Sequence, residues 1–164
     1  MLYQYSICFF RVDEDRIAAV GPDRACAEWL MRNGAFVKWK GAPEFLTDYN
    51  SLPPEGMKYF IQEIDATESS IMHYGGCKYI SAIKFERCAY LQDEALQELS
   101  ILKNSLQNLK IISCGNITDK GLKSLVILSN LQSLEVSDLI YLKSKEDCLS
   151  TLKSSLPNCK IEIQ

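Results

Sequence analysis

The sequence has little of what catalytic and metal sites are usually built from. Only one of its 164 residues is a histidine, His73, and its seven cysteines include no Cys-x-x-Cys pair, so the usual zinc-ligand spacings are missing. A Gly-x-Ser-x-Gly nucleophile motif and a glycine-rich phosphate loop are missing too. Because acid–base chemistry needs partner groups, His73 beside Gly75 and Gly76 is better interpreted as a loop side chain than as a general base. We therefore expect no catalytic residues and no enzyme.

An excess of basic charge and a long apolar run are also missing. Eighteen Lys and Arg against 21 Asp and Glu give a net charge of −3, which offers no reason to expect nucleic-acid binding. No apolar stretch approaches the ~20 residues that span a bilayer. Residues 1–10, MLYQYSICFF, have neither the features of a secretory signal nor the Arg- and Ser-rich character of a matrix transit peptide. The composition, 47% apolar and 24% charged, is that of an ordinary globular protein.

An internal repeat fills the C-terminal half of the chain. Its core positions Phe85, Ile111, Val136 and Ile161 follow one another at intervals of 26, 25 and 25 residues. A period in this range with Leu-x-x-Leu-x-Leu-x-x-Cys spacing is typical of leucine-rich repeats. The aligned copies are Ile80-x-x-Ile83-x-Phe85-x-x-Cys88, Leu106-x-x-Leu109-x-Ile111-x-x-Cys114, Leu131-x-x-Leu134-x-Val136-x-x-Leu139 and Leu156-x-x-Cys159-x-Ile161.

The repeat predicts strands that pair in one parallel sheet, each but the last followed by a helix. These strands are expected near residues 83–86, 109–112, 134–137 and 159–163. A degenerate first copy, Ile61-x-x-Ile64-x-Ala66-x-x-Ser69, precedes the next copy by 19 residues, with a tight turn at His73–Lys78 where other copies carry a helix.

Residues 1–60 do not follow the repeat. Here the pattern predicts helices near residues 13–20 and 20–34 and a short strand at 35–40, and the acidic run Asp13-Glu14-Asp15 is interpreted as a solvated helix start rather than a metal site. The predicted fold is therefore α/β: a short leucine-rich-repeat solenoid of about four repeats over residues 61–164, with a helical N-terminal cap domain over residues 1–60.

The odd number of cysteines favours free thiols in a reducing compartment over a disulfide framework. Cys88 and Cys114 share one repeat position, where a small buried thiol packs the turn after a strand, and Cys159 is expected at a core position of a strand. No neighbouring charge in the sequence activates Cys77 or Cys88, so packing is favoured over a redox pair.

The strands of the repeat present a candidate partner-binding surface. In a strand of pattern Leu-x-Leu the x residues point away from the core and toward the concave face of the solenoid. An ordinary solvated sheet surface and a protein-binding face both fit this pattern. The first expected column is mostly cationic, Lys84, Lys110, Glu135 and Lys160, and the adjacent column is mixed, Glu86, Ile112, Ser137 and Glu162.

Four segments together resemble a known family. They are Val20–Leu30 (VGPDRACAEWL), Gly34-Ala35, Ile64–Thr67 (IDAT) and Ile112–Gly121 (ISCGNITDKG). From about Val12 to the C-terminus the chain resembles the mitochondrial coupling factor B family, also called ATP synthase subunit s or the distal membrane-arm assembly component 2-like family. A Cys-x-Cys of that family appears here as Glu86-Arg87-Cys88, which departs from its pattern.

The resemblance implies a non-catalytic mitochondrial factor, peripheral to the inner membrane on its matrix side. Its expected partners are subunits of the ATP synthase complex, with a role in coupled proton conduction, and a second copy of the chain in a homo-oligomer. The resemblance also implies a magnesium ion near the junction of cap and first repeat, with ligand positions that match Gly34 and Thr67. Mg²⁺ accepts carbonyl oxygens and retains most of its water ligands, so backbone atoms at these two positions are chemically suitable.

Two alternatives share parts of this pattern. An assembly factor for the membrane arm of respiratory complex I would share both the cap and the repeats. A ubiquitin-ligase adaptor is a different class, since Cys-containing repeats with an Ile-Thr-Asp-x-Gly-Leu motif such as residues 117–122 are common there. Residues 1–60 lack the Leu-Pro-rich pattern that precedes the repeats of such adaptors, which argues against this second alternative.

Overall fold

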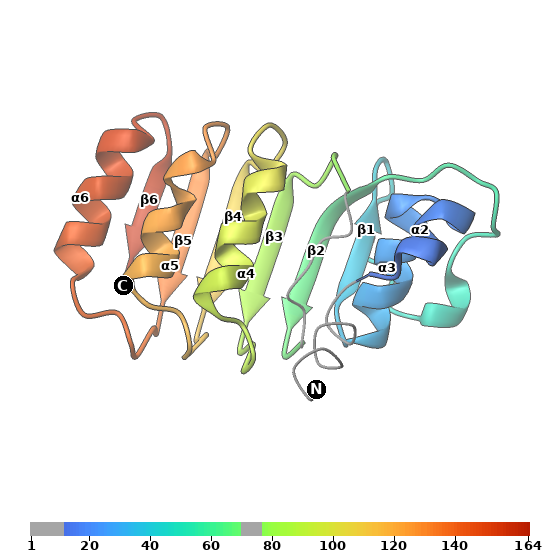
Figure 1. Ribbon diagram of the computed structural model, residues 1–164, viewed down its shortest axis with the longest axis horizontal. Helices are drawn as coiled ribbons and strands as arrows, with labels where there is room; N and C mark the ends of the chain where they lie inside the picture. Colours follow the sequence, from blue (N-terminus) through green and yellow to red (C-terminus); the bar gives the residue numbers. More distant parts are fainter. Residues whose placement is uncertain (1–11, 70–76) are drawn as a thin grey trace.

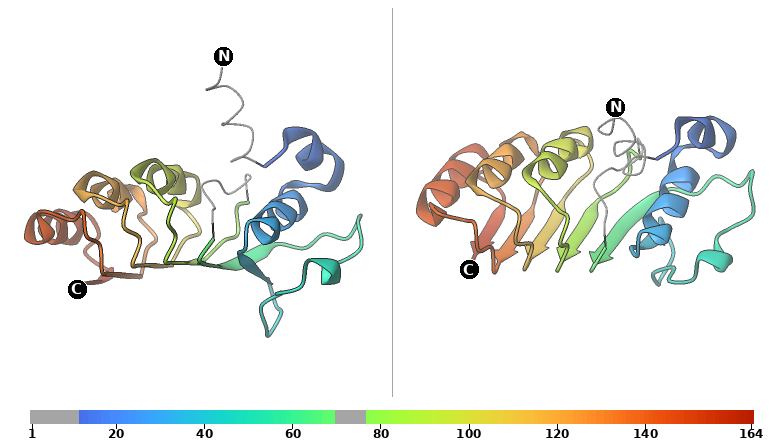
Figure 2. Two further views of the ribbon diagram at one scale, coloured as in Figure 1. Left: turned by 90° about the horizontal axis from the view of Figure 1, so that it is seen from below. Right: turned by 60° about the horizontal axis from the view of Figure 1, so that its bottom comes forward.

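One six-stranded sheet organises the molecule. The computed structural model describes residues 12–69 and 77–164. The strands stand in sequence order, β1-β2-β3-β4-β5-β6, and the five α-helices of the described residues all lie on one side of the sheet (Figures 1 and 2). The strands are β1 (Phe36–Trp39), β2 (Ile61–Thr67), β3 (Ala82–Glu86), β4 (Asn108–Ile112), β5 (Ser133–Ser137) and β6 (Lys160–Ile163).

Helices connect the later strands and cover the first two. The α-helices are α2 (Glu14–Val20), α3 (Pro22–Arg32), α4 (Asp93–Glu98), α5 (Asp119–Ser124) and α6 (Lys145–Ser155). The short 3-10 helices are η1 (Tyr49–Ser51), η2 (Leu99–Leu102) and η3 (Leu125–Ile127). Strands β2 to β6 run parallel, whereas β1 pairs antiparallel with β2 and so joins the N-terminal part to the same sheet. Within the described residues no helix combines the length and apolarity needed to cross a bilayer.

The parallel strands β2 to β5 end in the same turn. The residue after the strand has a left-handed backbone with φ between 51° and 56°, at Glu68, Arg87, Ser113 and Asp138. In three of these turns its N–H donates to the last carbonyl of the next strand, as from Arg87 to Ile112 at 2.9 Å. A non-glycine residue with positive φ carries backbone strain. The inter-strand hydrogen bond offsets this strain in each of the three turns that form it.

Side chains also tie each strand–helix unit to the next. The Asp93 carboxylate at the start of α4 accepts from the N–H and the hydroxyl of Thr118, at 2.8 and 2.6 Å. Asp119 at the start of α5 repeats this contact one unit later, accepting from the N–H of Lys143 at 2.9 Å. A Cβ at Gly121 would overlap the Asp93 carboxylate, so the glycine is what lets the two helices approach.

The core lies between the sheet and the helices. The inward side chains of β3, β4 and β5 are almost completely buried and lie in register, Phe85 beside Ile111 and Ile111 beside Val136. From the helices, Leu96, Leu122 and Leu152 are buried in the same core. No unit could bury these side chains alone, because its neighbours supply the other walls.

Leu109→Ala tests this dependence on neighbours. Leu109 is buried between Ile83 and Leu134 on the two adjacent strands, so its truncation leaves a cavity that spans two units. We expect the free energy of unfolding to fall by about 2–4 kcal/mol in chemical denaturation. The exposed Ile101, changed to alanine, serves as the control and should cost much less. A loss below about 1 kcal/mol for Leu109→Ala would contradict the packing described here.

The predicted strands and their parallel pairing are confirmed, with one error of register. The intervals Phe85 to Ile111 and Ile111 to Val136 match the observed partners, and so does the 19-residue offset between Ile64 and Ile83. In β6, however, Val136 pairs with Ile163 and not with Ile161. The last interval is therefore 27 residues, because α6 has 11 residues where α4 (six) continues into η2 (four) and α5 (six) continues into η3 (three).

This register changes the place of two predicted residues. Ile163 fills the buried position, while Ile161 lies beside Leu134 and is only partly buried at the sheet edge. Cys159, expected at a core position of a strand, precedes β6 and is partly exposed. The predicted turn at residues 73–78 lies mostly outside the described residues, and His73 lies wholly outside them.

The N-terminal helices begin and end where the sequence predicts. The Asp13 carboxylate accepts from the N–H groups of Asp15 and Arg16 at 2.9 and 3.4 Å, so the acidic run is a helix cap. Pro22 occupies the first turn of α3, and the helix ends at Asn33, after which Gly34 has φ 87°.

A buried carboxylate holds α2 and α3 against the loop that follows β1. Glu28 accepts from Arg16 Nε at 2.8 Å and from Arg24 Nε at 2.7 Å. Arg24 also donates to the carbonyl of Pro53, and Arg16 pairs with Glu55 at 2.5 Å. Hydrogen bonds from Arg16, opposed by burial and reinforced by Arg24, lower the pKa of Glu28 to about 2. The cluster therefore fixes the position of the loop from Pro53 onward.

Glu28→Gln should destabilise the fold in a pH-dependent way. Because the folded-state pKa of Glu28 lies below its ordinary 4.5, its contribution is fully present above pH 4.5 and is lost as the pH falls toward 2. We expect the free energy of unfolding to fall by about 1–3 kcal/mol at neutral pH. The value should lie toward the lower end of this range, because water screens the charge of the partly exposed Arg16. Urea titrations at stepped pH measure it, with the exposed Glu94→Gln as control. A difference that persists unchanged at pH ~2 would contradict the assignment.

Candidate functional site

The face of the sheet opposite the α-helices is open (Figure 2). The alternation of buried and less buried residues along the strands places the predicted partner-binding residues on this open face. Strand pairing arranges its side chains in rows that run across the strands. The central row holds Asp65, Lys84, Lys110, Glu135 and Glu162, and the second row holds Thr67, Glu86, Ile112 and Ser137. Seven of the eight predicted residues thus lie in these two rows, and Lys160 lies beside Ser133 in a third.

The predicted columns are wrong at β6. Lys160 was expected beside Glu135, and Glu162 beside Ser137, but Glu135 pairs with Glu162 instead. The central row consequently contains two lysines and three carboxylates. The interpretation of this row as mostly cationic is incorrect, for the same reason that the last interval is 27 residues long.

Ion pairs neutralise the open face. Lys84 Nζ lies 2.7 Å from Glu86 and 3.8 Å from Asp65. Lys110 lies 2.6 Å from Glu135, and Lys160 lies 2.7 Å from Glu162. The hydrogen bond from Lys84 lowers the pKa of Glu86, and the one from Lys160 lowers the pKa of Glu162. Exposed pairs of this kind add little stability but fix a pattern of alternating charge that a partner can match.

Ile112 interrupts this pattern near the middle of the face. It is the apolar member of the second row, between Glu86 and Ser137, and is half-buried. An apolar side chain framed by paired charges has the composition of a small protein-binding patch.

The thiols of the described residues are all free, as predicted. Cys88 donates to the carbonyl of Ala66 at 2.7 Å and Cys114 to that of Ile112 at 3.4 Å, so both pack the turn after a strand. A hydrogen bond with Cys88, together with burial, raises the pKa of the Cys114 thiol. A hydrogen bond with Cys26, together with burial, raises the pKa of Cys77. Raised pKa values keep these two thiols protonated and unreactive at neutral pH.

The two predicted magnesium ligands lie at the end of the sheet where β1 begins and β2 ends. Phe36 pairs with Asp65 and Val37 with Ile64. Gly34 precedes β1 and lies outside these pairs, where a Cβ would come 3.9 Å from Ser69 Cα, and Thr67 is the last residue of β2. The Thr67 N–H and hydroxyl both donate to Asp65 Oδ1, at 3.1 and 2.6 Å, which leaves backbone carbonyls as the natural ligands. No three His, Cys, Asp or Glu side chains among the described residues gather around a common point, so a carboxylate cage is not formed there. The positions fit a cation held by carbonyl oxygens and water.

Magnesium titration tests this pair. If carbonyls bind the ion, Thr67→Ala should retain most of the affinity, whereas Gly34→Val should lose it, because a branched residue at φ 87° displaces the turn. Gly41→Val is the matched control, since Gly41 has φ 83° and lies in a separate turn. Neutral ligands also predict weak binding that mild acid does not change. Calorimetry at two pH values measures both effects. A tight site that is lost near pH ~4 would instead indicate carboxylate ligands.

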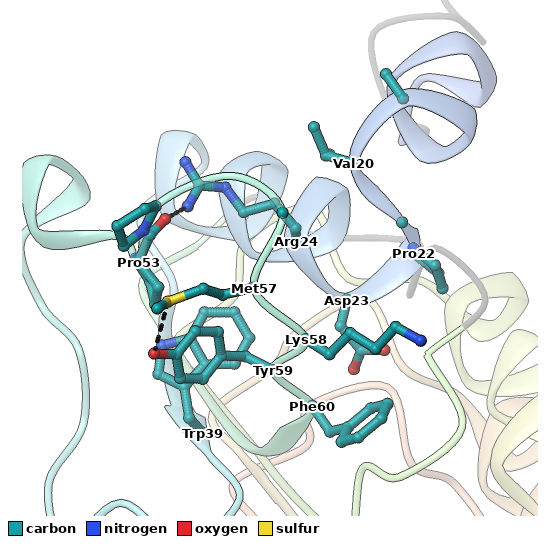
Figure 3. Close-up of a pocket in the computed structure, with 14 residues that line it drawn as sticks. Val20, Pro22, Asp23, Arg24, Trp39, Pro53, Met57, Lys58, Tyr59 and Phe60 are labelled. Atoms are coloured by element: carbon teal, nitrogen blue, oxygen red, sulfur yellow. Dashed lines mark hydrogen bonds between the residues drawn. The ribbon is translucent and has the colours of Figure 1, made fainter.

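A pocket of about 450 Å³ lies between α2, α3 and the segment after the prolines (Figure 3). Its walls include Trp39, Met57, Tyr59 and Phe60, with Lys58 among them. The sequence analysis missed this pocket. The signal that could have found it is the apolar-aromatic stretch at residues 57–60, which begins two residues after a proline pair and is unusually apolar for a loop.

Known proteins match the chain along nearly its whole length. No family model matches it. The Bos taurus protein named ATP synthase subunit s, mitochondrial is 44% identical over 164 residues, which are 94% of this chain and 82% of the bovine protein. The Homo sapiens protein of the same name is 44% identical over 165 residues, 95% of this chain and 82% of its own length. The Mus musculus protein is 43% identical over 164 residues, with 94% and 82% covered.

The chain belongs to the mitochondrial ATP synthase subunit s family. This membership confirms the resemblance recognised from the four sequence segments. It assigns no role to the open face, to Gly34 and Thr67 or to the pocket, so those sites stay predictions within the subunit s family.

Proposed function

We propose that this chain is a non-catalytic mitochondrial factor that associates with the ATP synthase complex and supports coupled proton conduction through it. The observation that carries this proposal is identity of 42–44% with proteins named ATP synthase subunit s, over 94–95% of the chain. At that level over that length the fold is expected to be shared. The association itself is carried by the relatives' name and is therefore proposed for this chain.

The proposed location is the matrix side of the inner membrane, where the chain is peripheral. In that location the chain would contact the membrane sector of the complex either directly, with one of its own surfaces, or through other subunits. This part of the proposal rests on the family alone.

We further propose that β3 to β6 with their helices are leucine-rich repeats. Support comes from the in-register core residues, the shared left-handed turn after each strand and the Asp93 and Asp119 contacts one unit apart. Repeats of this kind present a continuous sheet face to a partner, which makes the open face the proposed contact with the complex.

The open face suits a partner of alternating charge. Each lysine of the central row already has a carboxylate partner. Charged groups of a bound protein must therefore either replace one member of such a pair or add a further ion pair to it. Ile112 supplies the apolar contact around which such pairs can be arranged.

Affinity purification from mitochondria tests the proposed association. A tagged chain should recover ATP synthase subunits. The double variant Lys84→Glu with Lys110→Glu should recover about fivefold to tenfold less, with weaker salt dependence and a nearly unchanged melting temperature, because it reverses two exposed charges. Quantitative mass spectrometry measures the recovery.

Two comparisons make this result decisive. Lys103→Glu with Lys120→Glu makes the same charge change at exposed positions of η2's end and α5 and should recover as much complex as the wild type. Recovery of complex I subunits or of ubiquitin-ligase components in place of ATP synthase would overturn the proposal in favour of an alternative. Equal recovery by both double variants would remove the open face from the contact.

A further inference from the structure

The pocket beside α3 has features that the sheet and its core do not need. It is bounded by the end of α2, the first turn of α3, Trp39 and the segment from Pro53 to Phe60 (Figure 3). Its volume of about 450 Å³ lies in the range of sites that hold small ligands or a few residues of peptide. The Glu28 cluster fixes one wall, because Arg24 donates to the Pro53 carbonyl.

The floor of the pocket carries an unused hydrogen-bond donor. Trp39 is 8% exposed, and its indole Nε1 is the buried side-chain polar atom of the described residues that has no hydrogen-bond partner. A buried donor without a partner destabilises the fold, because it has lost its hydrogen bond to water and gained none in return. An acceptor that reached Nε1 would restore the lost hydrogen bond, so the indole favours a ligand with a carbonyl or similar oxygen.

Tyr59 covers this donor through loose contacts. Its ring lies 5.5 Å from the Trp39 ring, tilted by 49°, and its hydroxyl donates only to Met57 Sδ at 3.5 Å. Tyr59 is 39% exposed and Met57 is 58% exposed. Both side chains can therefore turn outward without breaking a strong interaction, and an incoming group could then reach the indole.

Apolar and basic side chains lie in and beside the pocket around Phe60. Phe60 packs edge-on against Tyr79, with ring centres 4.5 Å apart, and Lys40 lies over the Tyr79 ring at 5.5 Å. Lys58, which lines the pocket, and Lys40 have no carboxylate partner among the described residues, whereas Arg16 and Arg24 are both paired with Glu28. Exposed aromatic and methionine side chains are enriched in surfaces that bind protein segments. The two unpaired lysines add a positive charge that an acidic segment would complement.

We propose that this pocket binds a short extended peptide segment of a partner protein, with apolar or proline residues followed by acidic ones. A backbone carbonyl of the segment accepts from Trp39 Nε1 after Tyr59 turns outward. The apolar residues pack on Met57 and Phe60, and the acidic residues pair with Lys58 and Lys40. Extended and proline-containing segments fit aromatic pockets because their carbonyls are not used internally.

This inference goes beyond the proposed association with ATP synthase. The pocket lies on the helix side of β1, away from the open face, so a segment bound here leaves the rows of the sheet accessible. Failure of one proposal therefore leaves the other standing.

Peptide titration followed by the indole N–H resonances tests the site. The probe is the acetylated hexapeptide Pro-Leu-Pro-Pro-Asp-Asp. The matched control is Pro-Leu-Pro-Pro-Lys-Lys, in which lysines replace the two aspartates. Trp39→Phe assigns the two indole signals, since Trp29 supplies the other. We expect the acidic peptide to shift the Trp39 signal and not the Trp29 signal, and the lysine peptide to bind more weakly.

Three variants then locate the contacts. Trp39→Phe should weaken binding roughly three- to tenfold, the equivalent of one hydrogen bond. Lys58→Glu, at an exposed residue, should weaken it by about tenfold and reverse the preference toward the lysine peptide. Lys153→Glu on α6 makes the same charge change far from the pocket and should bind as the wild type does. Melting curves for each variant confirm that it is folded.

The opposite results would overturn the proposal. These are a Trp39 signal that no peptide moves at millimolar concentration, or equal binding by Lys58→Glu and Lys153→Glu. Vesicles of phosphatidylcholine and cardiolipin form a separate arm. A Trp39 shift with vesicles but not with the peptide would show a membrane contact and would likewise overturn the peptide site.

Discussion

The structure depends on contacts between neighbouring units rather than within them. A unit formed by β4 and α5 has no closed core of its own, because Ile83 on one side and Leu134 on the other complete the surroundings of Leu109. The polar contacts obey the same rule: the N–H groups after β2, β3 and β4 and the carboxylates at the starts of α4 and α5 are bonded to the neighbouring unit. The free energy of folding is therefore shared along the stack, and any unit is stable only while its neighbours are in place.

The open face and the pocket follow from the two ways in which the sheet is covered. Along the parallel strands, helices cover one face and leave the other to charged side chains in neutral pairs. At the antiparallel end, β1 replaces a strand–helix unit, and α3 with the Pro53 segment must cover the sheet instead. That cover is less regular than a stacked helix, and the space it leaves is lined by Trp39 and Tyr59.

Much of the fold was predictable because apolar spacing directly reports burial. Phe85, Ile111 and Val136 are large, evenly spaced and buried, and the sequence places each correctly. Ile161 and Ile163 are both isoleucine on the same face of one strand, so periodicity alone could not choose between them, and only the length of α6 decides. The error moved Lys160 and Glu162 by one row. The pocket could not be predicted because it depends on how a loop packs on a helix, which carries no period. Likewise, the ion pairs depend on side-chain reach across strands that the sequence does not reveal.

The close approach of Gly121 to Asp93 has a consequence for how such a chain can change over time. The motif Ile-Thr-Asp-x-Gly-Leu at residues 117–122 looks like a property of one unit, yet its glycine is required by a carboxylate that belongs to the unit before it. A substitution at either position alters which residues the other can accept, although 28 positions separate them in the chain. Tolerance to mutation at one site is therefore conditional on the identity of the other. The two positions should therefore vary together among descendants of this sequence. If a unit were duplicated without the aspartate of the unit before it, its glycine would no longer be required and other residues could replace it.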